Sequence, residues 1–250
     1  MRHRILFSFI ILTLLNVFNL QATKKSIGLL IVATGKYIQF VPPLIESARK
    51  YFCVDHTIHY YVFTDGTMNT GQDTTLIFQS RLGWPYDTLK RFSMYAQHAN
   101  RYCHHDYLFA LDADMQFVDY VGSEILSDRV ATLHPCLLNQ RGTYETRNCS
   151  TAYVAPYEGT YYFAGGFNGG STTEFIRMAQ TITANIEKDL EHNFIALWHD
   201  ESHVNRYYID NEPTCILSPD YCYPEGWDLP YHPRLLALLK DHKTFQQGAI

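Results

Sequence analysis

The sequence has no excess of basic residues, which excludes one large class of partner. Its 250 residues include 20 Lys and Arg against 25 Asp and Glu, a formal charge of -5. A general nucleic-acid binder presents a basic face to the phosphate backbone. We therefore expect no nucleic-acid partner.

The cysteines lack the paired spacing of a structural zinc site. No Cys-x-x-Cys pair occurs among the six, which are Cys53, Cys103, Cys136, Cys149, Cys215 and Cys222. A structural zinc ion needs four ligands at close spacing, so such a site is not expected. Dispersed cysteines suit one or two disulfides, whose pairing the sequence leaves open.

The N-terminal apolar run, residues 5–20, falls short of the roughly 20 residues that a membrane-spanning helix needs. Basic Arg2 and Arg4 precede it. The run is long for the core of a signal peptide and short for a span. We interpret residues 1–22 as a signal peptide or an N-terminal membrane anchor, and both interpretations carry residues 23–250 out of the cytosol.

Alternating strand and helix patterns fill the rest of the chain, with no internal repeat or low-complexity linker. Such alternation predicts an α/β fold with a nucleotide-binding half. Apolar and β-branched runs predict strands over 26–33, 59–65, 74–79, 107–117, 130–133 and 161–170. Helical spacing of apolar residues predicts helices over 38–51, 86–101, 172–196 and 198–208.

An acidic pair interrupts the strand predicted over 107–117. Asp112 and Asp114 stand one residue apart near its carboxyl end, and positions i and i+2 of a strand point to the same side. Open α/β sheets bind ligands at the carboxyl ends of their strands. Two carboxylates there suit Mg²⁺ or Mn²⁺, although acids after strands are also common turn formers.

A second cluster lies at the start of the helix predicted over 198–208. His199 and His203 are four residues apart, with Asp200 and Glu201 between them. A zinc hydrolase would use such a histidine pair, but its motif needs Glu directly after the first His. The alternatives are histidines that pack within an amphipathic helix, and carboxylates that line a sugar site.

Taken together, these motifs resemble glycosyltransferase family six, the family of the histo-blood-group A and B transferases, the α-1,3-galactosyltransferases and the Forssman synthases. In family order they are VATGKY at 32–37, HYYVFTD at 59–65, LDAD at 111–114, LHP at 133–135, GGFNGGS at 165–171, WHDESH at 198–203 and LSPD at 217–220. The resemblance implies a nucleotide-diphospho-sugar transferase (GT-A type) fold over residues 23–250, with a mixed central sheet flanked by helices.

The resemblance also implies a donor site for a UDP-sugar. Backbone groups of Val32, Ala33 and Thr34 would hold the uridine, and Tyr37 would stack on the uracil. Asp112 and Asp114 would bind Mn²⁺ across the pyrophosphate. The remaining donor contacts would come from Arg91, Ala113, Ala164, Gly166 and Lys240.

On the acceptor side, the resemblance implies a galactose-terminated glycan held by His134, Thr143, Trp198, Asp200 and Glu201. Glu201 would lie under the anomeric carbon and either attack it or stabilise its charge. The implied reaction is a retaining, Mn²⁺-dependent transfer of galactose or N-acetylgalactosamine in α-1,3 linkage. A sugar-binding protein of the same fold that has lost turnover is the alternative from another class.

Details of this chain sharpen three of these expectations. Ala164 and Gly166, at the donor-selecting positions, are small and leave room for an acetamido group, which favours UDP-N-acetylgalactosamine. The retained acids at 112 and 114 predict metal dependence. Lys240 matches the family's tail lysine that reaches the pyrophosphate, whereas the later tail arginine is replaced by Gln246, with Lys243 as a substitute.

The expected location is the Golgi membrane, facing the lumen, in a eukaryote, and the periplasm or the medium in a bacterium.

Overall fold

The computed structural model describes residues 23–138, 140–241 and 245. The predicted targeting segment, residues 1–22, lies outside the described residues, as do Lys243 and Gln246. The strands are β1 Ser26–Val32, β2 Thr57–Thr64, β3 Thr74–Phe78, β4 Tyr107–Asp112, β5 Met115–Phe117, β6 Arg129–Leu133, β7 Phe163–Ser171, β8 Cys215–Leu217, β9 Tyr223–Pro224 and β10 Leu235–Ala237. The α-helices are α1 Val41–Tyr51, α2 Tyr86–Leu89, α3 Arg91–Gln97, α4 Thr172–Glu191 and α5 His199–Asp210.

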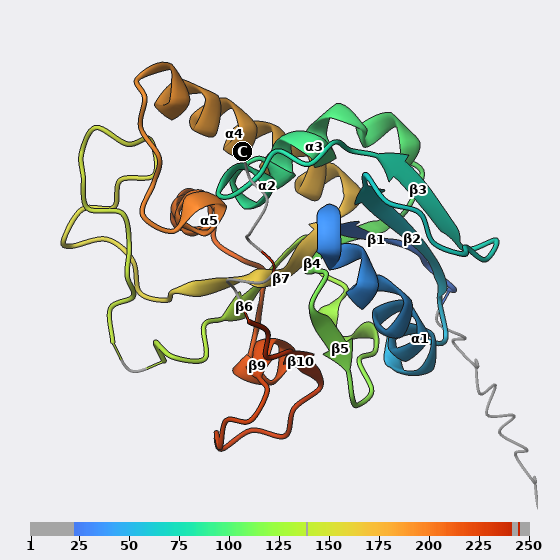
Figure 1. Cartoon of the computed structure of the whole chain (residues 1–250). Coiled ribbons are helices and arrows are strands. Elements are labelled where there is room, and N and C mark those ends of the chain that lie inside the picture. Colours follow the sequence, from blue (N-terminus) through green and yellow to red (C-terminus); the bar gives the residue numbers. More distant parts are fainter. Residues whose placement is uncertain (1–22, 139, 242–244, 246–250) are drawn as a thin grey trace, which may run out of the picture.

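A mixed seven-stranded sheet forms the centre of the molecule, in the order β3-β2-β1-β4-β7-β6-β8 (Figure 1). Strands β1 to β4 run parallel, and β7 pairs antiparallel with both β4 and β6. The carboxyl ends of β1 and β4 are therefore adjacent, with Val32 opposite Asp112. The predicted α/β fold with a mixed central sheet is confirmed.

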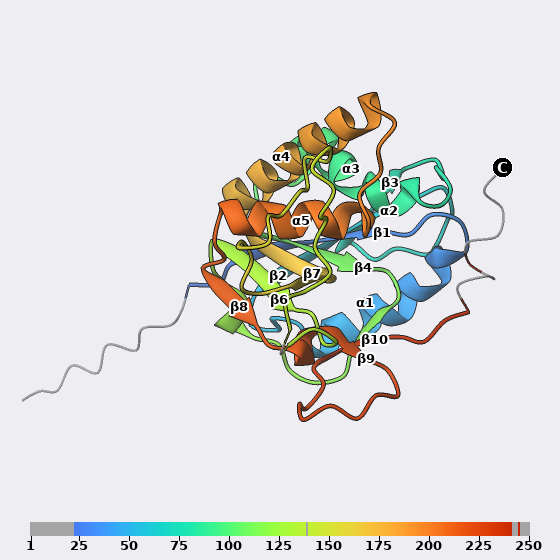
Figure 2. The ribbon, with the colours of Figure 1, turned by 90° about the vertical axis from the view of Figure 1, so that its left-hand side faces the viewer.

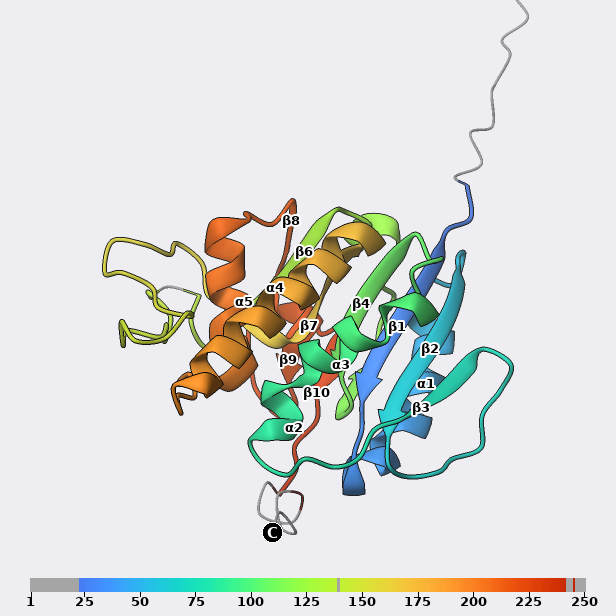
Figure 3. The same ribbon diagram turned by 90° about the horizontal axis from the view of Figure 1, so that it is seen from above.

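Helices cover both faces of this sheet (Figures 1 and 3). Helix α1 packs on one face, while α3, α4 and α5 cover the other. The alternation of β1 explains why both faces are buried: Leu29 and Ile31 point to the α1 side, and Leu30 points to the other helices. Side chains of β4 alternate in the same way, so the acidic motif follows a strand that is fixed on both faces.

The strand predicted over 107–117 is interrupted at the acidic pair. Strand β4 ends at Asp112, a turn contains Ala113 and Asp114, and β5 then enters a separate three-stranded sheet with β10 and β9. This small sheet lies on the opposite side of the central sheet from α4 and α5 (Figure 2). The chain turns because Met115 and Phe117 pair with Ala237 and Leu235 of β10. The turn, and not a continuous strand, therefore presents Asp114.

Two helix predictions need correction. The segment predicted as one helix over 86–101 is divided into α2, α3 and a 3-10 turn at Ala99–Arg101, with a break at Lys90. The helix predicted to end at residue 196 ends at Glu191, where Asn193 adopts a positive φ of 56°. An Asn in the left-handed region is a common way to terminate a helix.

The disulfide expectation is wrong in this structure, in which all six cysteines are free. The expected membrane anchor falls on residues outside those described. Within the described part of the chain, no helix combines the length and the apolar character needed to cross a bilayer.

Candidate active site

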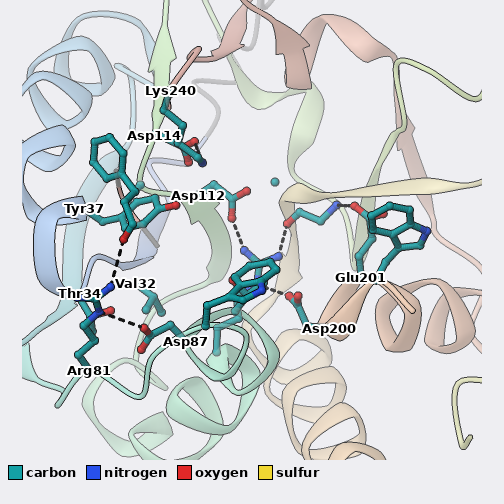
Figure 4. Close-up of a pocket in the computed structure, with 18 residues that line it drawn as sticks. Val32, Thr34, Tyr37, Arg81, Asp87, Asp112, Asp114, Asp200, Glu201 and Lys240 are labelled. Carbon is teal, nitrogen blue, oxygen red and sulfur yellow. Dashed lines mark hydrogen bonds and ion pairs between the residues drawn. The ribbon is translucent and has the colours of Figure 1, made fainter. Parts of the chain in front are cut away.

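A pocket opens at the carboxyl ends of β1 and β4, where an open α/β sheet is expected to bind its ligand. Figure 4 shows Tyr37, Asp114 and Lys240 on one side of it, Asp200 and Glu201 on the other, and Asp112 between them. The residues that line it are Val32, Thr34, Tyr37, Arg81, Trp84, Asp87, Thr88, Arg91, Asp112, Ala113, Asp114, Gly165, Gly166, Trp198, Asp200, Glu201, Lys240 and Phe245. The pocket therefore brings together most of the residues predicted from the sequence.

Arg91 connects the two sides of the pocket. Its Nη1 pairs with Asp112 Oδ1, its Nε donates to Asp200 Oδ2 at 2.5 Å, and its Nη2 donates to the Gly165 carbonyl at 2.7 Å. Burial would lower the pKa of Arg91, but Asp200 and Asp112 raise it above its ordinary value. Because Arg91 keeps its charge, it fixes two acids that lie 88 residues apart in the sequence.

Asp200 is almost completely buried, with 1% of its surface exposed. Burial raises its pKa to about 6, and the charge of Arg91 opposes that rise. The family resemblance implies that Asp200 orients the acceptor or the donor sugar beside it. The ion pair with Arg91 gives it a further role, which is to hold the guanidinium against Gly165 and Asp112.

Glu201 lines the pocket from the first turn of α5, with both carboxylate oxygens hydrogen-bonded. The backbone N–H of Gly165 donates to Oε2 at 2.8 Å, and the Tyr162 hydroxyl donates to Oε1 at 2.9 Å. Burial raises the pKa of Glu201 to about 7, while these two donors favour the charged form and lower it. A Cβ on Gly165 would lie 2.9 Å from Arg91 Nη2 and 3.4 Å from Glu201 Oε2, so glycine permits this close approach.

The second acid of the motif, Asp114, pairs with the ammonium group of Lys240. The Nζ of Lys240 forms an ion pair with Asp114 Oδ2 and lies 5.1 Å from the centre of the Tyr37 ring. Burial, followed by the charge of Asp112, raises the pKa of Asp114, and Lys240 opposes this rise. Lys240 was expected to reach a pyrophosphate, and its ammonium group is here an ion-pair partner of the acidic motif.

The ion pair between Lys240 and Asp114 shows that the acidic motif attracts a positive charge. Two neighbouring carboxylates at one end of the pocket provide hard oxygen ligands and attract a positive charge, as Mn²⁺ or Mg²⁺ requires. Among the described residues, however, no group of three or more His, Cys, Asp or Glu side chains is arranged to hold a metal. A metal there would therefore need further oxygen ligands from a phosphate or water.

The side of the pocket that holds Asp114 and Lys240 also offers backbone and aromatic surfaces. Val32 and Thr34 line it directly after β1, and Tyr37 stands in the 3-10 helix Gly35–Phe40. The ring of Phe245 lies 5.2 Å from the ring of Tyr37, centre to centre. Sequence reasoning did not anticipate Phe245, because nothing in its neighbourhood marks it.

Four of the predicted site residues do not line the pocket. Ala33 is fully buried beneath it, with its N–H bonded to Phe63, and Ala164 is buried at the start of β7. His134 contacts the Tyr162 ring at 5.7 Å, and Thr143 hydrogen-bonds to the Tyr162 side chain. His134 and Thr143, two of the five predicted acceptor residues, are therefore connected to Glu201 through Tyr162.

The zinc-hydrolase alternative is not favoured by the geometry of its histidines. His199 has a positive φ of 52° and packs its ring on Trp84 at 4.7 Å. His203 is 1% exposed, and its Nε2 lies 3.7 Å from Asp189. One ring therefore contacts an aromatic side chain and the other packs in the interior.

Several lining residues were missed by sequence reasoning, namely Arg81, Asp87, Thr88, Gly165 and Phe245. Trp84 also lines the pocket, and no role was predicted for it. Gly165 could have been found, since it begins the motif GGFNGGS at 165–171 and a glycine lets the backbone approach a ligand closely. Asp87, in α2, forms an ion pair with Arg81 at 3.9 Å, and the irregular segment that contains Arg81 offers no periodic signal.

Comparisons with known proteins identify the family of the chain. The rat histo-blood group ABO system transferase 1 is 35% identical over 246 residues, covering 92% of this chain and 70% of that protein. The human globoside alpha-1,3-N-acetylgalactosaminyltransferase 1 is 34% identical over 229 residues, covering 86% of this chain and 66% of that protein. The O-antigen biosynthesis glycosyltransferase WbnI of Escherichia coli is 30% identical over 209 residues, covering 80% and 89%. The family profile of glycosyltransferase family 6 matches residues 9–247, and the chain belongs to that family.

Proposed function

We propose that this protein is a retaining, Mn²⁺-dependent glycosyltransferase that moves N-acetylgalactosamine, or galactose, from a UDP-sugar in α-1,3 linkage to an acceptor galactoside. One observation carries the proposal. Glu201 stands in the same pocket as Asp112 and Asp114, and Arg91 lies between these groups. The pocket therefore has separate places for a leaving group and for the charge left on a sugar.

The leaving group belongs beside the acidic motif. Asp112 and Asp114 would hold a divalent cation, which neutralises charge on a departing diphosphate. Val32, Thr34 and Tyr37 line the end of the pocket assigned to the uridine. Lys240 forms an ion pair with Asp114. When a pyrophosphate binds in the pocket, the ammonium group of Lys240 can pair with the phosphate charge.

The sugar belongs between Arg91 and Glu201. Breaking the bond between C1 and the UDP oxygen leaves its electron pair on UDP and positive charge on the sugar ring. Glu201 either attacks C1 or stabilises that charge, and the acceptor hydroxyl then forms the new C1–O bond on the face that UDP has left. The hydroxyl proton is released with UDP. A carboxylate with two donors, Gly165 and Tyr162, keeps a fixed position through these steps.

The preference for N-acetylgalactosamine rests on Gly166, which lines the pocket, because Ala164 is buried and does not line it. A Cβ at position 166 would lie 3.1 Å from Cys222 Sγ and 3.4 Å from Asp112 Oδ2. A larger residue at position 166 would therefore crowd Cys222 and Asp112. The name of the human relative, an alpha-1,3-N-acetylgalactosaminyltransferase, points the same way.

The test is a donor-hydrolysis assay over a panel of UDP-sugars, with Mn²⁺ and with excess chelator. We expect hydrolysis of UDP-N-acetylgalactosamine ahead of UDP-galactose, and loss of the activity in chelator. Glu201→Gln should bind UDP nearly as well as the wild type while its turnover falls by about 100-fold or more. Near-normal turnover of that variant would remove Glu201 from the reaction.

The same assay separates the alternatives. A sugar-binding protein without turnover would bind UDP-sugars but hydrolyse none of them in Mn²⁺. A zinc hydrolase would contain zinc after purification and would depend on His199. Neither alternative requires Asp112, Asp114 and Glu201 to share one pocket.

A further inference from the structure

Tyr162 is a buried tyrosine with a hydroxyl that reaches the proposed active site. It directly precedes β7, has 3% of its surface exposed, and donates its hydroxyl to Glu201 Oε1 at 2.9 Å. Oε2 of Glu201 accepts a hydrogen bond from the backbone N–H of Gly165, and a change of side chain does not remove that donor. Tyr162 is thus a side chain through which the Glu201 carboxylate can be tested directly.

The ring of Tyr162 has little freedom to move. Tyr144 and His134 pack edge-on against it at 5.1 Å and 5.7 Å between ring centres. A Cβ on Gly142 would lie 2.2 Å from three atoms of Tyr162, so the backbone of the loop lies directly on the side chain. A ring enclosed on these sides delivers its hydroxyl to one place.

The hydroxyl remains a donor throughout the working pH range. Burial, and then the negative charge of Glu201, raise the pKa of Tyr162. A protonated phenol that donates a hydrogen bond to a carboxylate favours the charged form of that carboxylate. The charged form of Glu201 is the one that can attack or stabilise a cationic sugar.

We propose that Tyr162 is a positioning residue for Glu201, holding Oε1 of the carboxylate in place and linking it to the loop that carries His134 and Thr143. This inference rests on the proposed role of Glu201. It adds a residue outside the pocket lining, and it gives the two acceptor-side residues a physical connection to the catalytic carboxylate.

Other groups that face Glu201 are unchanged by a substitution at Tyr162. They come from several elements and comprise Arg91 of α3, Asp200 of α5, Cys136 after β6 and Cys222 beside β7. Replacing the tyrosine with phenylalanine removes only the hydroxyl and keeps the ring. A shift in the titration of Glu201 would therefore report the lost hydrogen bond.

The chain provides a matched control in Tyr144. This tyrosine is equally buried at 3%, belongs to the same cluster of rings, and donates its hydroxyl to the Tyr161 carbonyl at 2.5 Å instead of a carboxylate. Tyr144→Phe thus removes a buried hydroxyl of the same kind without removing a partner of Glu201.

The first measurement is the titration of Glu201 in the full chain, followed by carbon NMR of labelled glutamate side chains and assigned by comparison with Glu201→Gln. We expect Tyr162→Phe to raise the midpoint by about one pH unit, a tenfold change in proton affinity. Tyr144→Phe should leave the midpoint unchanged. An unchanged midpoint in Tyr162→Phe, or an equal shift in both variants, would overturn the inference.

The second measurement is the rate of UDP-sugar hydrolysis against pH. In Tyr162→Phe the acid limb of kcat should move to higher pH by a similar amount, with KM for the donor almost unchanged. A uniform loss of rate at every pH, matched by Tyr144→Phe, would indicate a structural role only and contradict the proposal. If the wild type hydrolyses no UDP-sugar, the proposed function fails, and the NMR titration still decides whether Tyr162 holds the carboxylate.

Discussion

Arg91→Met should destabilise the protein strongly, because it removes the positive charge shared by two acids. Arg91 and Asp200 are 6% and 1% exposed, and the guanidinium also bonds the Gly165 carbonyl. Removing one partner of a buried ion pair costs about 3–5 kcal/mol in the free energy of unfolding. For a chain of this size each kcal/mol lowers the melting temperature by about 2–4 °C. We therefore expect Tm to fall by about 6–20 °C near pH 8.

The loss should depend on pH in a defined direction. Burial already raises the pKa of Asp200 to about 6 in the presence of Arg91, and removing the arginine raises it further. A carboxyl with a folded pKa above its unfolded value binds protons more tightly in the folded state, so stability falls as pH rises between the two values. The penalty of Arg91→Met should accordingly be smaller at pH 5 than at pH 8.

Thermal unfolding at the two pH values measures this effect, with Arg49→Met as the control. Arg49 pairs with Asp73 through two hydrogen bonds of 2.8 and 2.7 Å, but both side chains are partly exposed, at 49% and 34%. Such a surface pair contributes about 0–1 kcal/mol. The double variant Arg91→Met/Asp200→Asn should lose most of the pH dependence. Equal losses for Arg91→Met and Arg49→Met, or a larger loss at pH 5, would refute the reasoning.

Three further changes test the site. Glu201→Gln should raise Tm at pH 8 by removing a charge that burial disfavours, worth about 1–3 kcal/mol, with little gain at pH 5; a lower Tm at pH 8 would contradict this. Lys240→Met should bind Mn²⁺ about three- to tenfold more tightly by calorimetry, because no ammonium competes for Asp114, and weaker binding would be the opposite result. Gly166→Ala should reduce hydrolysis of UDP-N-acetylgalactosamine relative to UDP-galactose by about tenfold, and an unchanged ratio would remove position 166 from donor selection.

The central strands were predictable because both faces of the sheet are covered there, so consecutive side chains along each strand are apolar. The continuous apolar run of β1 and the run before Asp112 could only belong to strands that are covered on both sides. The carboxyl ends of such strands indicate the ligand edge. The pocket lies at this edge and is lined by Asp112, Asp114 and Thr34. Local pattern predicted the edge, whereas the role of Thr34 came from the family resemblance.

The interior of the site could not be predicted in the same way. The pairing of Arg91 with Asp200 joins residues 109 positions apart, and neither residue differs locally from an ordinary surface charge. The break at Lys90 was equally hidden, since Leu89, Phe92 and Tyr95 keep helical spacing across it and all three are buried. Periodicity detects which face is buried, but it does not detect an interruption that preserves that face.

The balance of charge in the pocket explains why a divalent cation suits it. Five carboxylates line the pocket. Asp87 pairs with Arg81, and the other four, on Asp112, Asp114, Asp200 and Glu201, share the pocket with the cations of Arg91 and Lys240. With every group ionised, these six side chains carry a net charge of two negative, and a diphosphate would add more of the same sign. Arg91 is committed to Asp112 and Asp200, so its charge is not available to a second anion. We therefore expect a donor to bind more favourably with a cation that offsets its charge, and the acidic pair at the end of β4 is the place proposed for that cation.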